Sequence, residues 1–136
     1  MDDFAHHPTA VRETINAVRS AYRGRRLWAV FEPRSNTSKR NIFEQEFASA
    51  LALADRILLA SVYQPERVPD GERLSVENVV NRINRLTADD RAGKAASGTE
   101  IATIIARDSQ PGDVVLVMSN GGFDNVHDKI LQALAG

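Results

Sequence analysis

The sequence predicts one α/β domain of the Rossmann-like kind, with a mostly parallel sheet and helices on both faces. Three observations support this fold class. Short continuous apolar runs, typical of strands buried on both faces, occur along the chain. Between them lie segments whose apolar residues repeat at helical spacing, and this alternation favours right-handed crossovers between parallel strands. The length of 136 residues suits a single domain, residues 1–136, with one core.

The first predicted elements are a helix and a strand. Thr9 can cap the helix, and Gly24 suits the position just past its end. The residues expected to face the core repeat at helical spacing: Val11, Ile15, Val18 and Tyr22. The apolar run 27–31 then predicts a buried strand.

Two further helices and a second strand follow. Asn41 and Glu44 can form a capping pair for a helix whose core face is Phe43, Phe47, Ala50, Leu51 and Ala54. The run 56–60 predicts the second buried strand. Prolines and an Asp-Gly pair predict a long surface connection over 61–74. Ser75 can then cap a helix whose inward face is Val76, Val79, Val80 and Ile83.

The rest of the chain repeats the alternation. The segment 94–97 predicts a short strand, followed by a helix that Thr99 caps and whose apolar face is Ile101, Ile104 and Ile105. A Pro-Gly-Asp turn at 111–113 leads into 114–118, the clearest predicted strand. A glycine-rich loop and a last helix are expected after it, with an apolar face of Phe123, Ile130, Leu131 and Leu134.

Charge and composition exclude several function classes. The 17 basic and 18 acidic residues leave a net charge of −1, which gives no general attraction to nucleic acid or to an anionic membrane. Without cysteine, the chain has no disulfide, no thiolate metal site and no thiol nucleophile. No run approaches the roughly 20 apolar residues of a membrane span, and the acidic N-terminus lacks the features of a signal peptide. A cytoplasmic protein is therefore expected.

Candidate site residues gather in three segments, at 2–9, 32–40 and 119–125. In open parallel sheets, ligands bind at the carboxyl ends of strands. The second and third segments directly follow predicted strands, so we expect both to reach that edge. The first segment precedes a helix and can join them there.

The N-terminal segment places two carboxylates and two imidazoles close together in sequence, at Asp2, Asp3, His6 and His7. One interpretation is a loop whose side chains satisfy backbone groups or face solvent. A metal site is disfavoured, because carboxylate and histidine ligands need a preorganised shell that this spacing does not show. General acid–base catalysis is a further alternative, although no partner group is evident.

The other two segments have compositions suited to anions. Arg34 and Arg40 lie among hydroxyl and amide side chains, including Asn36, which suits phosphate or carboxylate binding. A solvated loop with a helix-capping asparagine is the alternative. Backbone amides of a glycine-rich turn can approach an anion at a helix N-terminus. The turn after the last predicted strand contains Ser119, Asn120 and Gly121. It is not a Walker A loop, because no Gly-Lys-Ser/Thr follows.

Three runs together resemble a known family: DDFAHHPT at 2–9, FEPRSNT at 31–37 and VMSNGGF at 117–123. The chain resembles the C-terminal domain of the Mur ligases, ATP-dependent enzymes that build and recycle the peptide stem of bacterial cell wall. Within the family, the second and third runs resemble those of muropeptide ligases. This resemblance implies a ligase that joins UDP-N-acetylmuramate to L-alanyl-γ-D-glutamyl-meso-diaminopimelate, the murein tripeptide, in peptidoglycan recycling.

The resemblance also implies roles for individual residues. The N-terminal loop of the family contributes to the ATP site, which implies nucleotide contacts for Asp3, His6 and His7. Contacts to the muramate and tripeptide substrates are implied for Arg34, Asn36, Arg40, Ser119, Asn120 and Gly121. No catalytic residue and no metal ligand is assigned to this chain.

ATP and magnesium would be bound mainly by the central domain of such an enzyme, and the motifs of that domain do not occur in this sequence. The N-terminal domain that binds UDP is also absent. This chain alone is therefore expected to be inactive, and its partners would be the substrates and the enzyme's own other domains. One alternative is the same domain of a UDP-N-acetylmuramate–L-alanine ligase, which Ser35-Asn36 and the Ser-Asn-Gly-Gly turn disfavour. Another is a non-catalytic module that binds a nucleotide or an anion.

Overall fold

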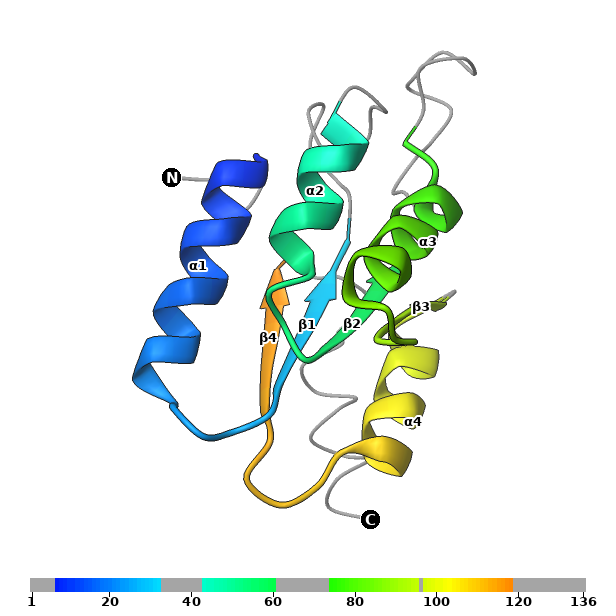
Figure 1. Ribbon diagram of the computed structural model, residues 1–136. Coiled ribbons are helices and arrows are strands. Elements are labelled where there is room, and N and C mark those ends of the chain that lie inside the picture. The colour runs from blue at the N-terminus through cyan, green and yellow to red at the C-terminus, as the bar shows by residue number, and fades with distance from the viewer. Residues whose placement is uncertain (1–6, 33–42, 61–73, 96, 119–136) are drawn as a thin grey trace.

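The computed structural model describes residues 7–32, 43–60, 74–95 and 97–118. Over these ranges the chain forms a four-stranded parallel sheet in the order β3-β2-β1-β4 (Figure 1). The strands are β1 (Leu27–Phe31), β2 (Arg56–Ala60), β3 (Ala92–Ala95) and β4 (Val114–Met118). The helices are α1 (Pro8–Ala21), α2 (Glu44–Leu51), α3 (Val76–Thr87) and α4 (Gly98–Asp108). The predicted Rossmann-like parallel sheet is confirmed. Among the described helices, none combines the length and the hydropathy needed to cross a membrane.

The apolar runs predicted three of these strands with their bounds, β1, β2 and β4. The fourth strand, β3, begins at Ala92 and ends at Ala95, earlier than the predicted segment 94–97. The difference arises because Ser97 belongs to the next helix. Its hydroxyl oxygen accepts a hydrogen bond from the Glu100 N–H at 3.2 Å and caps α4. Thr99, the predicted cap, lies inside the helix instead.

The two faces of the sheet are covered by different helices. Along β1, Leu27, Ala29 and Phe31 pack with α1, α2 and α3, which lie in front of the sheet in Figure 1. Trp28 and Val30 pack with α4 on the other face. The helices contribute the residues predicted to face the core, above all Val11, Ile15, Phe47, Ala50, Leu51, Val79, Ile83, Ile101 and Ile105. The central strands β1 and β2 are buried almost throughout, which explains why they read as continuous apolar runs.

Some residues that the sequence assigned to the surface or to the core lie elsewhere. Leu74 ends the predicted surface connection, yet it is buried in the core that α1, α2 and α3 share. The remainder of that connection lies outside the described residues. Tyr22, predicted to face the core, is 50% exposed because α1 ends before it. Gly24 follows with a φ of +81°, in the left-handed region that favours glycine.

Helix α1 begins earlier than Thr9. Its N-cap is His7, whose Nδ1 accepts a hydrogen bond from the Thr9 backbone N–H at 3.2 Å. Pro8 takes the first helical position, where the N–H that proline lacks would have no partner within the helix. The N-cap of α1 is therefore His7, and the prediction of a Thr9 cap is wrong.

The N-termini of α2 and α3 are joined by one carboxylate. The predicted capping pair is wrong, because Phe43 is the N-cap of α2 and makes no side-chain cap hydrogen bond. Glu44 instead accepts a hydrogen bond at Oε2 from the Ser75 N–H at 2.6 Å. Ser75 caps α3 as predicted, since its Oγ accepts a hydrogen bond from the Asn78 N–H at 3.1 Å. Asn41 lies outside the described residues.

The Glu44 contact can be tested by substitution. We expect Glu44→Gln to lower the free energy of unfolding by about 1 kcal/mol, because a neutral amide oxygen accepts more weakly than a carboxylate. Glu46→Gln is the matched control, since Glu46 lies in the same first turn of α2 and is exposed. Urea denaturation measures both variants. Equal losses would mean that the bond to Ser75 contributes nothing.

Helix α3 ends in a left-handed residue that is not glycine. Ala88 has φ 53° and ψ 39°. Its N–H donates to the Arg85 carbonyl at 3.4 Å, and the Asp89 N–H donates to the Asn84 carbonyl at 3.2 Å. This is the hydrogen-bond pattern of a Schellman C-cap, a position at which glycine is common because it has no Cβ.

We therefore expect Ala88→Gly to raise the free energy of unfolding by about 0.5–1 kcal/mol, because it removes the cost of a Cβ in the left-handed region. The control is Ala106→Gly, on the exposed side of α4. This substitution should lower the free energy of unfolding by about 1 kcal/mol, because glycine is unfavourable inside a helix. Thermal or urea unfolding checks the opposite signs. A loss at both positions would contradict the strain at Ala88.

Candidate functional site

The order of the strands reverses between β1 and β4. From β1 the chain moves through α2 to β2 and through α3 to β3, and it returns through α4 to the other side of β1. Ligands of open α/β sheets bind outside the carboxyl ends of the strands at such a reversal. Phe31 and Met118, the last residues of β1 and β4, are register partners, and the Glu32 N–H donates to the Met118 carbonyl at 3.2 Å. The carboxyl edge at β1 and β4 is therefore the candidate functional site.

Helix N-termini point to this edge. In Figure 1, α1, α2 and α3 run opposite to the strands, so their first turns lie near the arrowheads. Their unpaired N–H groups give each N-terminus a partial positive charge that favours anions. Acidic residues in the first turn offset this charge in α2 and α3, whereas α1 has none. The first turn of α1 therefore lacks the acidic side chains that oppose an anion at the N-termini of α2 and α3.

His7 is the predicted ligand-binding residue that the structure describes, and it lies at the N-terminus of α1. It is exposed, with Nδ1 held by the Thr9 N–H. Its imidazole packs against the Phe43 ring, with centroids 5.0 Å apart and planes at 59°. Because Phe43 is the N-cap of α2, this contact joins the N-termini of the two helices. Sequence patterns place Phe43 only in a core stripe, and no local signal indicates its contact with the histidine.

The other predicted site residues lie outside the described residues: Asp3, His6, Arg34, Asn36, Arg40, Ser119, Asn120 and Gly121. Their roles stay predictions. The described structure does show that the two strands preceding the predicted segments 32–40 and 119–125 are neighbours in the sheet. Within the described part of the chain, no three His, Asp or Glu side chains gather closely enough to hold a metal ion.

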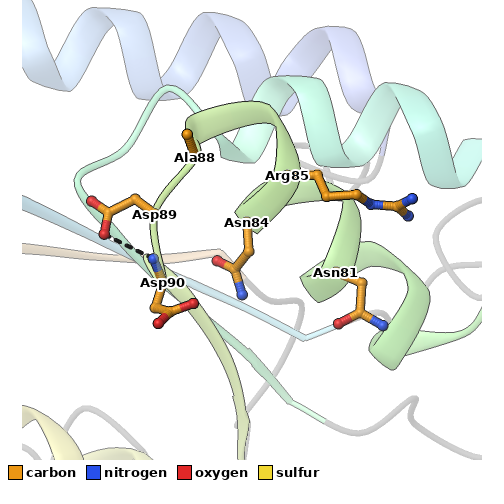
Figure 2. A pocket seen from close by; sticks show the side chains of 6 residues that line it. All are labelled: Asn81, Asn84, Arg85, Ala88, Asp89 and Asp90. Atoms are coloured by element: carbon orange, nitrogen blue, oxygen red, sulfur yellow. Dashed lines mark hydrogen bonds between the residues drawn. The ribbon is translucent and has the colours of Figure 1, made fainter.

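A polar hollow of about 830 Å³ lies away from this edge, between the C-terminal end of α3 and the start of β3 (Figure 2). Asn84 is among its lining residues, and both polar atoms of its side chain make a hydrogen bond. Its Oδ1 accepts a hydrogen bond from the Ala92 N–H at 2.9 Å, and its Nδ2 donates to the Ala92 carbonyl at 3.2 Å. Asp89 Oδ1 accepts from the Asp90 N–H at 2.8 Å. The two Asn84 bonds hold Ala92, the first residue of the edge strand β3, against α3, which is a structural role.

A buried carboxylate that sequence patterns do not reveal lies at the amino ends of the strands. The Asp113 side chain is 7% exposed. Its Oδ2 accepts hydrogen bonds from Arg26 Nη2 at 2.8 Å, Trp28 Nε1 at 2.9 Å and the Gln110 N–H at 2.9 Å. Although burial raises the pKa of Asp113, the bonds from Arg26, Gln110 and Trp28 and the Arg26 charge outweigh burial and hold that pKa below its ordinary value.

The surroundings of Asp113 also assign it to the scaffold. Asp113 ends the predicted Pro-Gly-Asp turn, which is confirmed by its N–H donating to the Gln110 carbonyl at 3.0 Å. The guanidinium carbons of Arg26 and Arg56 lie 5.5 Å and 4.8 Å from the centre of the Trp28 ring. Such cation–π contacts stabilise a desolvated aromatic residue. The cluster fastens β1 to the turn before β4, at the end of the sheet opposite the candidate site.

Comparison with known proteins identifies the family. The family model described as "Mur ligase, glutamate ligase domain" matches residues 1–121. An Escherichia coli (strain K12) relative, a UDP-N-acetylmuramate–L-alanyl-γ-D-glutamyl-meso-2,6-diaminoheptandioate ligase, is 39% identical over 135 residues. The match covers 98% of this chain and 27% of the relative. A UDP-N-acetylmuramate–L-alanine ligase of Janthinobacterium sp. (strain Marseille) is 36% identical, over 98% of this chain and 28% of that protein.

Solved structures agree. The crystal structure of a murein peptide ligase from Psychrobacter arcticus 273-4 superposes with a TM-score of 0.77 at 34% sequence identity. The match covers 100% of this chain and 27% of that chain. This chain therefore spans little more than a quarter of the length of these three relatives. The family model, the identity along nearly the whole chain and the parallel sheet together show that the chain belongs to the Mur ligase family.

Proposed function

We propose that this chain is the acceptor-binding domain of an ATP-dependent ligase that joins UDP-N-acetylmuramate to the murein tripeptide. The observation that carries the proposal is the 39% identity, over 98% of the chain, to a relative named for that reaction. The reversal of strand order between β1 and β4 supports it, because ligands of open α/β sheets bind at such a reversal and the two predicted substrate segments follow these strands in sequence. In the whole enzyme the domain would present the tripeptide amine to an activated muramate carboxyl group.

The proposal divides the predicted residues between two ligands. Asp3, His6 and His7 would contact ATP. The substrates would be held by Arg34, Asn36, Arg40, Ser119, Asn120 and Gly121. A reaction that uses ATP in this way includes phosphoryl transfer, which needs a metal ion and a phosphate-binding loop. This sequence has no such loop motif, so another domain would supply the loop and bind the metal. The N-terminus of α1, whose first turn carries no acidic residue, fits a contribution to anion binding only.

Turnover of the full-length protein tests the proposal. The protein is incubated with UDP-N-acetylmuramate, ATP and magnesium, and with either the tripeptide or L-alanine, and ADP and the amide product are measured. We expect the tripeptide to give the higher kcat/KM and this chain alone to release no ADP. A higher kcat/KM with L-alanine would favour the function of the Janthinobacterium relative. No ADP release with either acceptor would favour a non-catalytic binding module.

An NMR titration of this chain separates the two ligands. Tripeptide is expected to shift signals of Arg34, Asn36 and Ser119, and L-alanine is expected to leave them unchanged. ATP is expected to shift signals of His6 and His7. If L-alanine alone shifts the first group, the acceptor assignment is wrong; if ATP leaves the histidines unchanged, they do not bind nucleotide in this chain.

A further inference from the structure

His7 uses its two ring nitrogens differently. A backbone N–H can only donate, so the Thr9 N–H at 3.2 Å requires an unprotonated Nδ1 in the histidine it contacts. In the neutral imidazole the proton is then on Nε2. His7 as a residue is exposed. One nitrogen therefore serves the helix, and the other remains a donor.

Phe43 fixes the plane of the same imidazole. The tilted contact, with centroids 5.0 Å apart and planes at 59°, is of the kind that aromatic rings prefer. Phe43 is itself held in place: it packs against the main core, and the next residue, Glu44, is bonded to the Ser75 N–H. The ring beside His7 thus belongs to the packed scaffold.

We propose that Phe43 is a positioning residue that, together with the Thr9 N–H, holds His7 in the Nε2–H tautomer and aims that donor at an acceptor atom of the bound nucleotide. The tautomer and the ring contact stand on the geometry alone. The identity of the ligand rests on the proposed function. The location is consistent with this ligand, because His7 caps the one helix of the three whose first turn carries no acidic residue.

The tautomer is tested on this chain without any ligand. Long-range proton–nitrogen NMR spectra of the chain with isotope-labelled histidine distinguish protonated from unprotonated ring nitrogens. They are recorded at alkaline pH, where imidazoles are neutral. His7→Asn identifies the His7 signals by their loss. We expect Nδ1 unprotonated and Nε2 protonated, and we expect Phe43→Leu to shift the His7 ring protons by removing the ring current. A proton on Nδ1, or unshifted His7 ring protons in the Phe43 variant, overturns the proposal independently of the function of the protein.

Paired substitutions in the full-length enzyme test the role of each nitrogen. Asparagine can place an acceptor near the position of Nδ1, and glutamine can place a donor near that of Nε2. We expect His7→Asn to raise KM for ATP about tenfold with little change in kcat, and His7→Gln to raise it less. Equal KM values in wild type and His7→Asn would overturn the donor role.

Phe43 has its own control. Phe43→Leu keeps an apolar side chain and is expected to raise KM for ATP about three- to tenfold, the effect of losing one aromatic contact. Phe43→Tyr keeps the ring and should restore the wild-type KM. Tyr22→Leu, an exposed aromatic residue beyond the other end of α1, should leave KM unchanged. Unchanged KM in Phe43→Leu overturns the positioning role. An inactive wild-type enzyme would instead overturn the proposed function. The NMR test of the tautomer and of the ring contact would still be valid.

Discussion

Asp113→Ala is expected to lower the free energy of unfolding by about 3 kcal/mol. Removing one partner of a buried ion pair costs about 3–5 kcal/mol, and the lower end applies because the Arg26 side chain is 29% exposed and can recruit water. Trp28 Nε1 and the Gln110 N–H lose their acceptor as well. Since small domains are stable by only about 5–15 kcal/mol, this loss should be evident in urea denaturation.

The pH dependence of a second variant, Asp113→Asn, gives a second readout. The pKa of Asp113 is lower in the folded protein than in the unfolded chain. Its contribution is therefore fully present above the ordinary aspartate pKa of about 4 and is lost as the pH falls through the folded value. The free energies of unfolding of wild type and Asp113→Asn should approach each other below that pH. Parallel curves would contradict a shifted Asp113.

Glu77→Ala provides the control for Asp113. Glu77 also pairs with a cation, Lys94, at 2.7 Å, but the two side chains are 70% and 60% exposed. The pKa of Glu77 is lowered, first by the hydrogen bond from Lys94 and then by its charge. Exposed pairs contribute little, so the free energy of unfolding of this variant should fall far less than that of Asp113→Ala. A loss equal to that of Asp113→Ala would mean that burial is not what makes Asp113 important.

Local patterns predicted most of the fold because the central strands β1 and β2 are buried almost throughout. A run such as 27–31 has few alternatives to a central strand, and its bounds were recovered without error. Helix starts were predicted less well, since capping depends on one or two residues. Ser97 with Glu100 forms a capping-box spacing that favours the observed start of α4 over Thr99. Pro8 at the first helical position likewise indicates a cap at residue 7.

Contacts between distant segments could not be predicted from the sequence. Arg26 and Asp113 are 87 positions apart, and each taken alone is an ordinary charged residue near a turn. The spacing of Asn41 and Glu44 in the sequence fits a standard capping rule. In the structure, however, the Glu44 carboxylate accepts a hydrogen bond from the Ser75 N–H, 31 positions away, because the fold brings α2 beside α3. The candidate site was predictable to the extent that it depends on strand ends, which are local. The partner of His7 depends on packing between helices and was not.

In the full-length protein, Arg40→Ala is expected to lower kcat/KM for ligation about 10- to 100-fold, the effect of losing one hydrogen bond to a charged group. This follows from the proposed role of Arg40 in holding the muramate carboxyl group or its acyl phosphate. Arg40 lies in a polar run without apolar spacing, so its loss should leave folding unchanged. Initial rates of ADP release, with UDP-N-acetylmuramate as the varied substrate, measure the effect.

Two further variants decide how Arg40 acts. Arg40→Lys keeps the charge but loses the fork that binds two oxygens, so it should recover part of the activity only. Arg23→Ala, an exposed arginine in the turn after α1 and thus beyond the opposite end of the sheet, should be fully active. If Arg40→Ala keeps wild-type turnover, Arg40 does not bind substrate. If Arg23→Ala is impaired to the same degree, the effect reflects the net charge of the domain, and the substrate site must be sought among Arg34 and the residues that follow β4.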